Sequence, residues 1–192
     1  LVNDVLDFSK IKSGVLSFES KPFELKRLAE AVKETHSQKA KELFNRIVLD
    51  YDKDLPDQII GDELRIGQVL NNLVNNAVKF TEAGTIKLTI NKLGSSENRH
   101  RIFFSVKDTG IGIPEDMQSL VFEQFIQAES GTSRKYGGTG LGLSIVKGLL
   151  KAMDSKISLT SELGKGTEIS FELLLQEAKT NPTINPNEDE EH

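Results

Sequence analysis

Hydrophobic residues recur at helical spacing along residues 62–81, DELRIGQVLNNLVNNAVKFT. The apolar stripe consists of Ile66, Val69, Leu70, Leu73, Ala77 and Phe80. This spacing predicts an amphipathic helix with one buried face. At about 100° per residue, Asn72, Asn76 and Lys79 share one flank of that face. Asn71 and Asn75 are predicted to face solvent. Because asparagine is a mediocre helix former, the two flanking asparagines indicate either a ligand or hydrogen bonds to neighbouring loops.

The pattern of apolar and polar residues also predicts the other elements. Further helices are expected over residues 1–11, 23–44, 115–125 and 139–153. Alternating apolar and polar residues predict strands at 46–51, 85–90, 102–106, 156–161 and 167–175, and a short strand is expected at 15–18. Most of these strands have one apolar and one polar face, which is typical of a sheet covered on one side. The fold class that follows is a two-layer α/β sandwich.

Composition adds few constraints. The chain has 192 residues and no cysteine, and no apolar run approaches a membrane span. Residues 176–192 carry five acids and one base, so most of the net charge of −5 lies there and no nucleic-acid surface is implied. We expect three segments: the end of an upstream helical domain at 1–14, a folded domain at 15–175 and a disordered acidic tail or linker at 176–192.

A carboxylate continues an apolar strand face. Ile102, Phe104 and Val106 are predicted to point inward, and Asp108 follows them on the same face. A buried carboxylate needs a hydrogen-bond donor. A turn amide, a nearby lysine or a ligand would each serve. Gly110 and Gly112 follow directly and let the backbone approach whatever supplies the donor.

A glycine-rich turn precedes the last predicted helix. In YGGTGLGL, residues 136–143, the glycines run into the helix start. Backbone amides at such a start suit a phosphate, although a flexible hinge would use the same glycines. The turn matches neither a Walker loop nor a dinucleotide fingerprint. Residues 126–138 before it are rich in Gly, Ser and Thr, and indicate a mobile lid that carries Arg134 and Lys135.

The order of these motifs closely resembles the ATP-binding catalytic domain of sensor histidine kinases. The motifs are Asn72, Asn76 and Lys79 on a helix, Asp108 before Gly110 and Gly112, Phe122 and Phe125, then Gly138, Gly140 and Gly142. The resemblance covers residues 22–175 approximately, and residues 3–14 resemble the end of that family's dimerisation domain. It implies the Bergerat fold, a mixed, mostly antiparallel sheet with helices on one face, shared with DNA gyrase, a heat-shock chaperone family and a mismatch-repair ATPase.

The resemblance also implies roles for the candidate residues. Asp108 would accept a hydrogen bond from the adenine amine, and Gly110 and Gly112 would let the ring lie close to the backbone. Asn76 would bind Mg²⁺, with Asn72 and Lys79 beside it toward the phosphates. The remaining nucleotide-binding positions would be Phe125, Gly138, Thr139, Gly140, Leu141 and Gly142, and Arg134 and Lys135 would either reach the γ-phosphate or remain solvated.

The implied function is ATP-dependent and Mg²⁺-dependent phosphorylation of a histidine. The acceptor would lie upstream of Leu1, so we expect this segment to bind ATP or ADP without phosphorylating itself. The implied partners are a response regulator or receiver domain and a second copy of the parent protein, joined through upstream helices. The domain would be cytoplasmic, and any membrane contact would come from the rest of the parent.

Two alternatives differ from this reading. A Bergerat-fold ATPase would carry a glutamate general base where this chain has Asn72, which favours a kinase with weak ATP hydrolysis. A degenerate nucleotide-binding interaction module would be expected to lose Asn76, Asp108 or the last glycines, and all of these are present.

Overall fold

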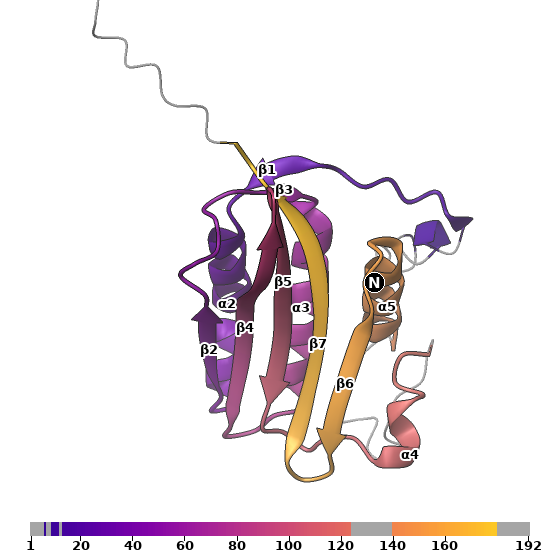
Figure 1. Ribbon diagram of the computed structural model, residues 1–192. Helices are drawn as coiled ribbons and strands as arrows, with labels where there is room; N and C mark the ends of the chain where they lie inside the picture. Colours follow the sequence, from indigo (N-terminus) through magenta and orange to yellow (C-terminus); the bar gives the residue numbers. More distant parts are fainter. Residues whose placement is uncertain (1–5, 7–8, 12, 124–139, 180–192) are drawn as a thin grey trace, which may run out of the picture.

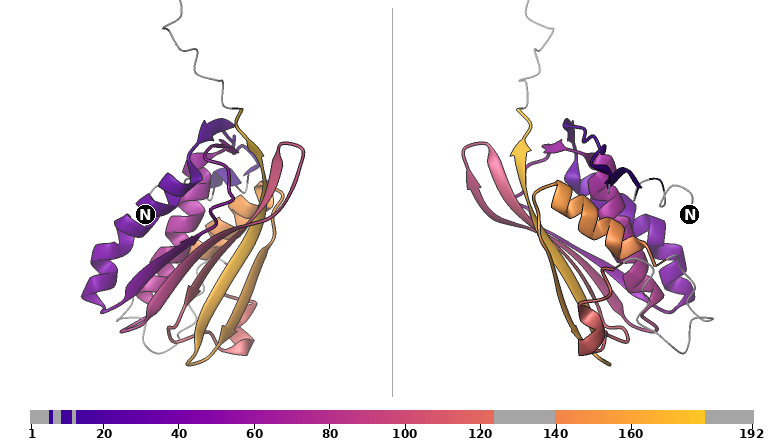
Figure 2. Two further views of the ribbon diagram at one scale, coloured as in Figure 1. Left: turned by 60° about the vertical axis from the view of Figure 1, so that its left-hand side comes forward. Right: turned by 90° about the vertical axis from the view of Figure 1, so that its right-hand side faces the viewer.

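Helix α3 lies at the centre of a helical layer that covers one face of a seven-stranded sheet (Figures 1 and 2). The structure is a computed structural model that describes residues 6, 9–11, 13–123 and 140–179. Its elements are β1 (Lys21–Phe23), α2 (Leu25–Glu42), β2 (Arg46–Tyr51), β3 (Ile59–Gly61), α3 (Glu63–Lys79), β4 (Thr85–Ser96), β5 (Arg99–Asp108), α4 (Glu115–Gln118), α5 (Gly142–Ala152), β6 (Ile157–Glu162) and β7 (Gly166–Glu177). Helices α2, α3 and α5 form the layer.

The sheet is mixed and mostly antiparallel. Its strand order is β1-β3-β7-β5-β4-β2, and β6 pairs with β7 outside this path. Strand β2 pairs with β4 in parallel, and the other neighbours are antiparallel. The predicted two-layer sandwich is therefore confirmed.

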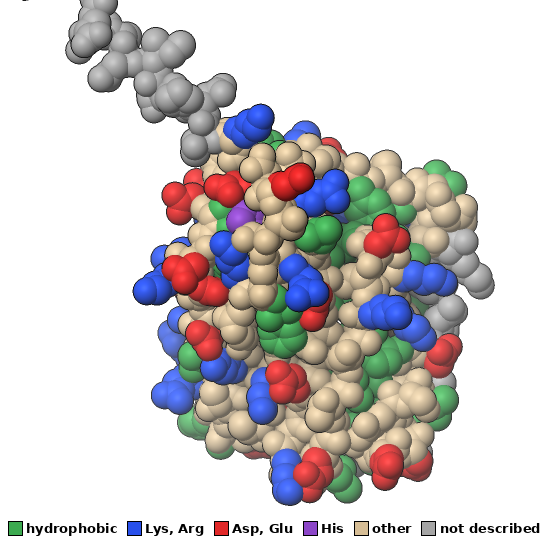
Figure 3. All heavy atoms as spheres, viewed as in Figure 1, with side chains coloured by type: hydrophobic (Ala, Val, Ile, Leu, Met, Phe, Trp, Pro, Cys, Tyr) green, Lys and Arg blue, Asp and Glu red, His purple; other side chains and the backbone are tan. Residues whose placement is uncertain are grey.

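The two faces of the sheet differ as the alternation predicts. On the helix side, Ile86, Leu88 and Ile90 are fully buried. The opposite face, which faces the viewer in Figure 3, carries interspersed acidic and basic side chains. Ion pairs lie across neighbouring strands there, such as Arg101 with Glu172 at 3.8 Å. Cross-strand pairs of opposite charge stabilise a solvated sheet face.

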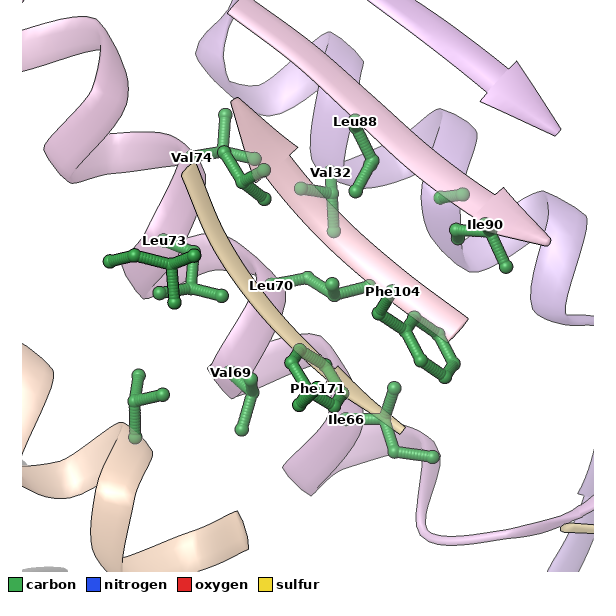
Figure 4. Packing of buried hydrophobic residues seen from close by; sticks show 14 of the residues in the cluster. Val32, Ile66, Val69, Leu70, Leu73, Val74, Leu88, Ile90, Phe104 and Phe171 are labelled. Carbon is green, nitrogen blue, oxygen red and sulfur yellow. The ribbon is translucent and has the colours of Figure 1, made fainter. Parts of the chain in front are cut away.

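The core forms between α3 and the central strands (Figure 4). Ile66 and Leu70 of the predicted stripe are at most 1% exposed, and the rings of Phe104 and Phe171 stack with centroids 4.8 Å apart. The buried part of α3 is wider than the predicted stripe, because α2 and α5 pack along its two sides. Val74 is fully buried for this reason.

The prediction for the N-terminal connection is wrong in detail. Residues 15–18 form no strand, and the short strand β1 comes later and contains Pro22. Strand β1 is an edge strand and, among the described strands, pairs with β3 alone, so a residue without an N–H is tolerated there. The Glu19 amide donates to Asp62 Oδ2 at 2.8 Å and so ties the preceding segment to the residue before α3.

Several other boundaries differ from the predicted ones; β4, for example, continues past residue 90 to Ser96. Helix α4 ends at Gln118, and the chain continues in turns to Glu123, the last described residue before Gly140. Strand β7 runs past Leu175 to Glu177. Of the helices that the structure describes, none combines the length and apolar character that a membrane span requires.

Candidate functional site

The end of α3 meets the end of β5 where the central strands of the sheet end, at the bottom of Figure 1. The Ile111 amide donates to the Phe80 carbonyl oxygen at 3.1 Å, which joins the turn after β5 to the residue that ends α3. Asn76 lies one helical turn before Phe80, and Asp108 lies just before Ile111. The amide and the carboxylate predicted to share a site therefore lie at the same edge of the molecule.

Helix α3 presents Asn72 and Asn76 to the start of α5. Both side chains are half-buried. A Cβ added at Gly142, the first residue of α5, would lie 3.6 Å from Asn72 Oδ1 and 3.9 Å from Asn76 Nδ2. The structure thus brings the two flanking asparagines to a helix N-terminus, where backbone N–H groups and the helix dipole favour an anion.

The other two asparagines of α3 are not alike. Asn75 is exposed, as predicted. The prediction that Asn71 faces solvent is wrong, because its Oδ1 lies 2.9 Å from His36 Nε2 and its Nδ2 donates to the Gly67 carbonyl oxygen. The packing of α2 against α3 brings His36 to this position. Asn71 therefore links two helices.

Lys79 lies in the last turn of α3. Its Nζ is 4.8 Å from the centroid of the Phe80 ring, in a cation–π contact, and the side chain is half-buried. The contact places the ammonium group over the ring of the residue that ends α3.

Asp108 is buried at the end of β5, with 8% of its surface exposed. The Gly110 amide donates to Oδ1 at 2.8 Å, and the Thr167 amide donates to the same atom at 3.3 Å. Both backbone donors that the described residues supply thus reach one carboxylate oxygen. Burial raises the pKa of Asp108, and these two hydrogen bonds and the nearby Thr81 hydroxyl act against this increase.

The two glycines after Asp108 serve different purposes. A Cβ at Gly110 would overlap the Phe80 carbonyl oxygen, so this residue must be glycine for the strand end to approach α3. Gly112 has a φ of +70°, and a Cβ there would overlap the Glu162 carbonyl oxygen. Gly112 therefore packs against the β6–β7 turn, and only Gly110 lies against the Asp108 side chain.

The structure describes some of the remaining predicted site residues and not others. Gly140 has a φ of +67°, and Leu141 is buried as the N-cap of α5. Phe122 is half-buried in the turns after α4. Five candidates lie outside the described residues: Phe125, Arg134, Lys135, Gly138 and Thr139.

Sequence reasoning missed two polar residues at this edge. Asn45 and Thr81 are both buried, at 7% and 2% exposure, and they contact each other and the end of α3. Neither belongs to a periodic pattern or a glycine motif. Only their burial indicates a role.

Comparison with known proteins agrees with this geometry. The model of the family described as histidine kinase-, DNA gyrase B- and HSP90-like ATPases matches residues 61–177, which contain α3, β5 and α5. This chain belongs to that ATPase family. The predicted family resemblance is confirmed, although the match by itself assigns no role to a single residue.

Individual members of the ATPase family show how this chain compares with whole proteins. The signal transduction histidine-protein kinase BarA of Escherichia coli (strain K12) is 40% identical over 187 residues, which are 97% of this chain and 20% of BarA. The sensor histidine kinase AruS of Pseudomonas aeruginosa is 39% identical over 175 residues, which are 91% of this chain and 18% of AruS. The chain spans about a fifth of the length of these curated relatives.

Solved structures of this ATPase family share the fold. Full-length ShkA in complex with AMPPNP has a TM-score of 0.79 and 37% identity, over 92% of this chain and 35% of that one. The nucleotide-free catalytic domain of the histidine kinase ThkA has a TM-score of 0.64 and 29% identity, over 82% of this chain and 95% of that domain. This chain and the ThkA catalytic domain match over most of both lengths, which supports the predicted fold of the catalytic domain.

Proposed function

We propose that this chain is the ATP-binding domain of a sensor histidine kinase, which binds ATP or ADP with Mg²⁺ and donates the γ-phosphoryl group to a histidine. The observation that supports this function most directly is the meeting of the α3 asparagines, Asp108 and the start of α5 at one edge of the sheet. Membership of the ATPase family and the likeness to ShkA, which was solved with AMPPNP, agree with it.

Asp108 is the proposed base-recognition group. Because both backbone donors reach Oδ1, Oδ2 is available to accept a hydrogen bond from the adenine amine. Guanine presents an oxo group at that position, and two acceptors would face each other. A buried acceptor of this kind discriminates strongly between the two bases.

Asn76 is the proposed protein ligand of the metal. Mg²⁺ is usually bound by a few protein oxygens together with phosphate oxygens and water. The described residues contain no cluster of three or more His, Cys, Asp or Glu that could hold a metal, and an amide oxygen beside the phosphates fits that mode. When bound, Mg²⁺ neutralises phosphate charge. Asn72, Lys79 and the amides at the start of α5 would lie along the phosphates.

The acceptor histidine belongs to the parent protein or its partner copy. The two described histidines are engaged: His36 pairs with Asn71, and His100 is 5% exposed with its Nε2 3.0 Å from Glu177 Oε2. A response regulator or receiver domain would then take the phosphoryl group, and the parent would dimerise through helices outside the described residues. We place the ATP-binding domain in the cytoplasm, where it would have direct access to ATP.

Residues of the predicted lid complete the proposed site. Arg134 and Lys135 would offset phosphate charge, and Phe125, Gly138 and Thr139 would help to close the site. A Bergerat-fold ATPase remains the second candidate. Asn72 argues against it, because an amide cannot act as the general base that would activate water.

Calorimetric titration with ADP in the presence and absence of Mg²⁺ tests this function. Wild type should bind ADP, and Mg²⁺ should strengthen binding. Asn76→Ala should lose the Mg²⁺ effect, about tenfold in affinity, as expected for the loss of about 1.4 kcal/mol from one contact. Asn75→Ala is the matched control, because Asn75 is the exposed neighbour on the same helix. Absence of ADP binding by wild type, or an equal loss in both variants, would contradict the proposal.

A further inference from the structure

A buried hydroxyl group lies beside Asp108. Thr81 is 2% exposed, and its Oγ1 makes no hydrogen bond within the part of the chain that the structure describes. An unsatisfied buried polar group destabilises a fold, and most native proteins avoid it. Such a group at the edge of a ligand site indicates that the bond is completed when the site is in use.

The backbone at Thr81 is fixed by Asn45. The Asn45 side chain donates through Nδ2 to the Thr81 carbonyl oxygen at 2.6 Å, and its Oδ1 accepts from the Gly84 amide at 2.9 Å. Asn45 itself is buried at the end of α2 and thereby joins the ends of α2 and α3. The position of Thr81 is therefore set by contacts that do not involve its own hydroxyl.

The orientation of the Thr81 side chain is fixed as well. A Cβ added at Gly84 would lie 2.6 Å from Thr81 Cγ2, so the methyl group lies against Gly84. A Cβ added at Gly110 would lie 2.7 Å from Thr81 Oγ1 and 2.9 Å from Asp108 Oδ1. The hydroxyl and the carboxylate oxygen thus face the same space above Gly110.

We infer that Thr81 is a positioning residue for base recognition: its hydroxyl donates to Asp108 Oδ1 when a nucleotide base binds, and so holds Oδ2 toward the amine of that base. This inference rests on the proposed function. A donor on Oδ1 also favours the ionised carboxylate, which is the form that accepts a hydrogen bond from an amine. The lowering effect of the Thr81 hydroxyl on the pKa of Asp108 agrees with this role.

No charged side chain takes over this task among the described residues. Burial raises the pKa of Asp108, the Gly110 and Thr167 amides and the nearby Thr81 hydroxyl lower it, and no lysine, arginine or acid among the described residues contributes. Removal of the hydroxyl should therefore raise the pKa of Asp108 further. Only the ionised form accepts a hydrogen bond from the amine. As the pH is lowered, a variant without the hydroxyl should therefore lose nucleotide affinity at a higher pH than wild type does.

Two comparisons test the inference, wild type with Thr81→Val and Thr81→Ser with Thr81→Ala. Each protein is titrated with ADP in the presence of Mg²⁺ over a series of pH values. Thr81→Val keeps the methyl group against Gly84 and removes the hydroxyl. Thr81→Ser keeps the hydroxyl, and Thr81→Ala removes both groups. We expect wild type and Ser to bind ADP alike, whereas Val and Ala bind about tenfold more weakly and lose affinity at a higher pH. Thermal unfolding without nucleotide serves as the control for an intact fold in each variant.

The outcomes are distinguishable. If wild type binds ADP and the Val and Ala variants bind it equally well, the inference is wrong and the proposed function stands. If Ser loses as much affinity as Ala, packing of the methyl group explains the effect and the inference is again wrong. If wild type binds no ADP, the proposed function itself fails. Should Val not fold, the comparison of Ser with Ala, which differ only in the hydroxyl, decides alone.

Discussion

Two buried aspartates at opposite ends of the sheet show how the same side chain serves different purposes. Asp62 is 7% exposed and Asp108 is 8% exposed. Asp62 precedes α3, and its Oδ1 accepts from the Arg65 amide at 2.9 Å while its Oδ2 accepts from the Glu19 amide at 2.8 Å. Asp108 receives both of its backbone donors, from Gly110 and Thr167, on Oδ1.

The difference lies in the use of the second oxygen. Asp62 uses both oxygens within the fold, one to cap α3 and one to hold the segment before β1. Asp108 keeps one oxygen for a ligand, in the arrangement that we propose. Burial alone therefore does not identify a binding carboxylate, and the distribution of donors over its two oxygens does.

The largest effect is expected from Asp108→Asn. The amide keeps an oxygen for the Gly110 and Thr167 amides but places an NH₂ group where the base amine would bind. Two donors then face each other, so ADP affinity should fall about 100-fold, which corresponds to about 2.7 kcal/mol. Calorimetry measures the affinity, and thermal unfolding serves as the control for an intact fold. Affinity within a factor of a few of wild type would show that Oδ2 is not the acceptor.

The same substitution at Asp62 should give the opposite pattern. Asp62→Asn keeps an oxygen for the helix cap and turns an NH₂ group toward the Glu19 amide. The free energy of unfolding should fall by about 1 kcal/mol, because one hydrogen bond is replaced by a repulsive contact. Urea unfolding measures this change, and ADP affinity should equal that of wild type. A loss of affinity comparable to that of Asp108→Asn would remove the contrast between the two aspartates.

A smaller effect is expected in the pH dependence of stability. The pKa of Asp108 is raised above its ordinary value of 3.8, so the folded state holds this proton more tightly than the unfolded chain. Its contribution to stability is fully present below pH 3.8 and is lost as the pH rises through the folded-state pKa. Compared with wild type, Asp108→Asn should therefore gain relative stability as the pH rises from acid to neutral.

Urea unfolding of both proteins at a series of pH values measures this gain. Asp62→Asn serves as the control for pH effects common to the whole chain. If the difference between wild type and Asp108→Asn stays constant over this range, burial has not raised the pKa of Asp108.

The sequence alone determined the layers and most elements of this protein. Period-two strands with one polar face required a sheet covered on one side, and the α3 stripe required a buried helix. It also indicated which residue types could form a nucleotide site, because Asp108 continues an apolar face and Asn72 and Asn76 flank one. These features follow from local periodicity, which fixes the side of its own element on which a side chain lies.

Tertiary structure decided which of those side chains remain available. Asn71 is engaged by His36, Gly112 packs against the β6–β7 turn, and the buried Thr81 hydroxyl finds no partner in the described part of the chain. Each of these facts depends on residues far away in the chain: His36 for Asn71, Glu162 for Gly112 and Asn45 for Thr81. Periodicity contains no information about such partners, because hydrogen bonds between distant elements form only when packing has fixed their relative positions.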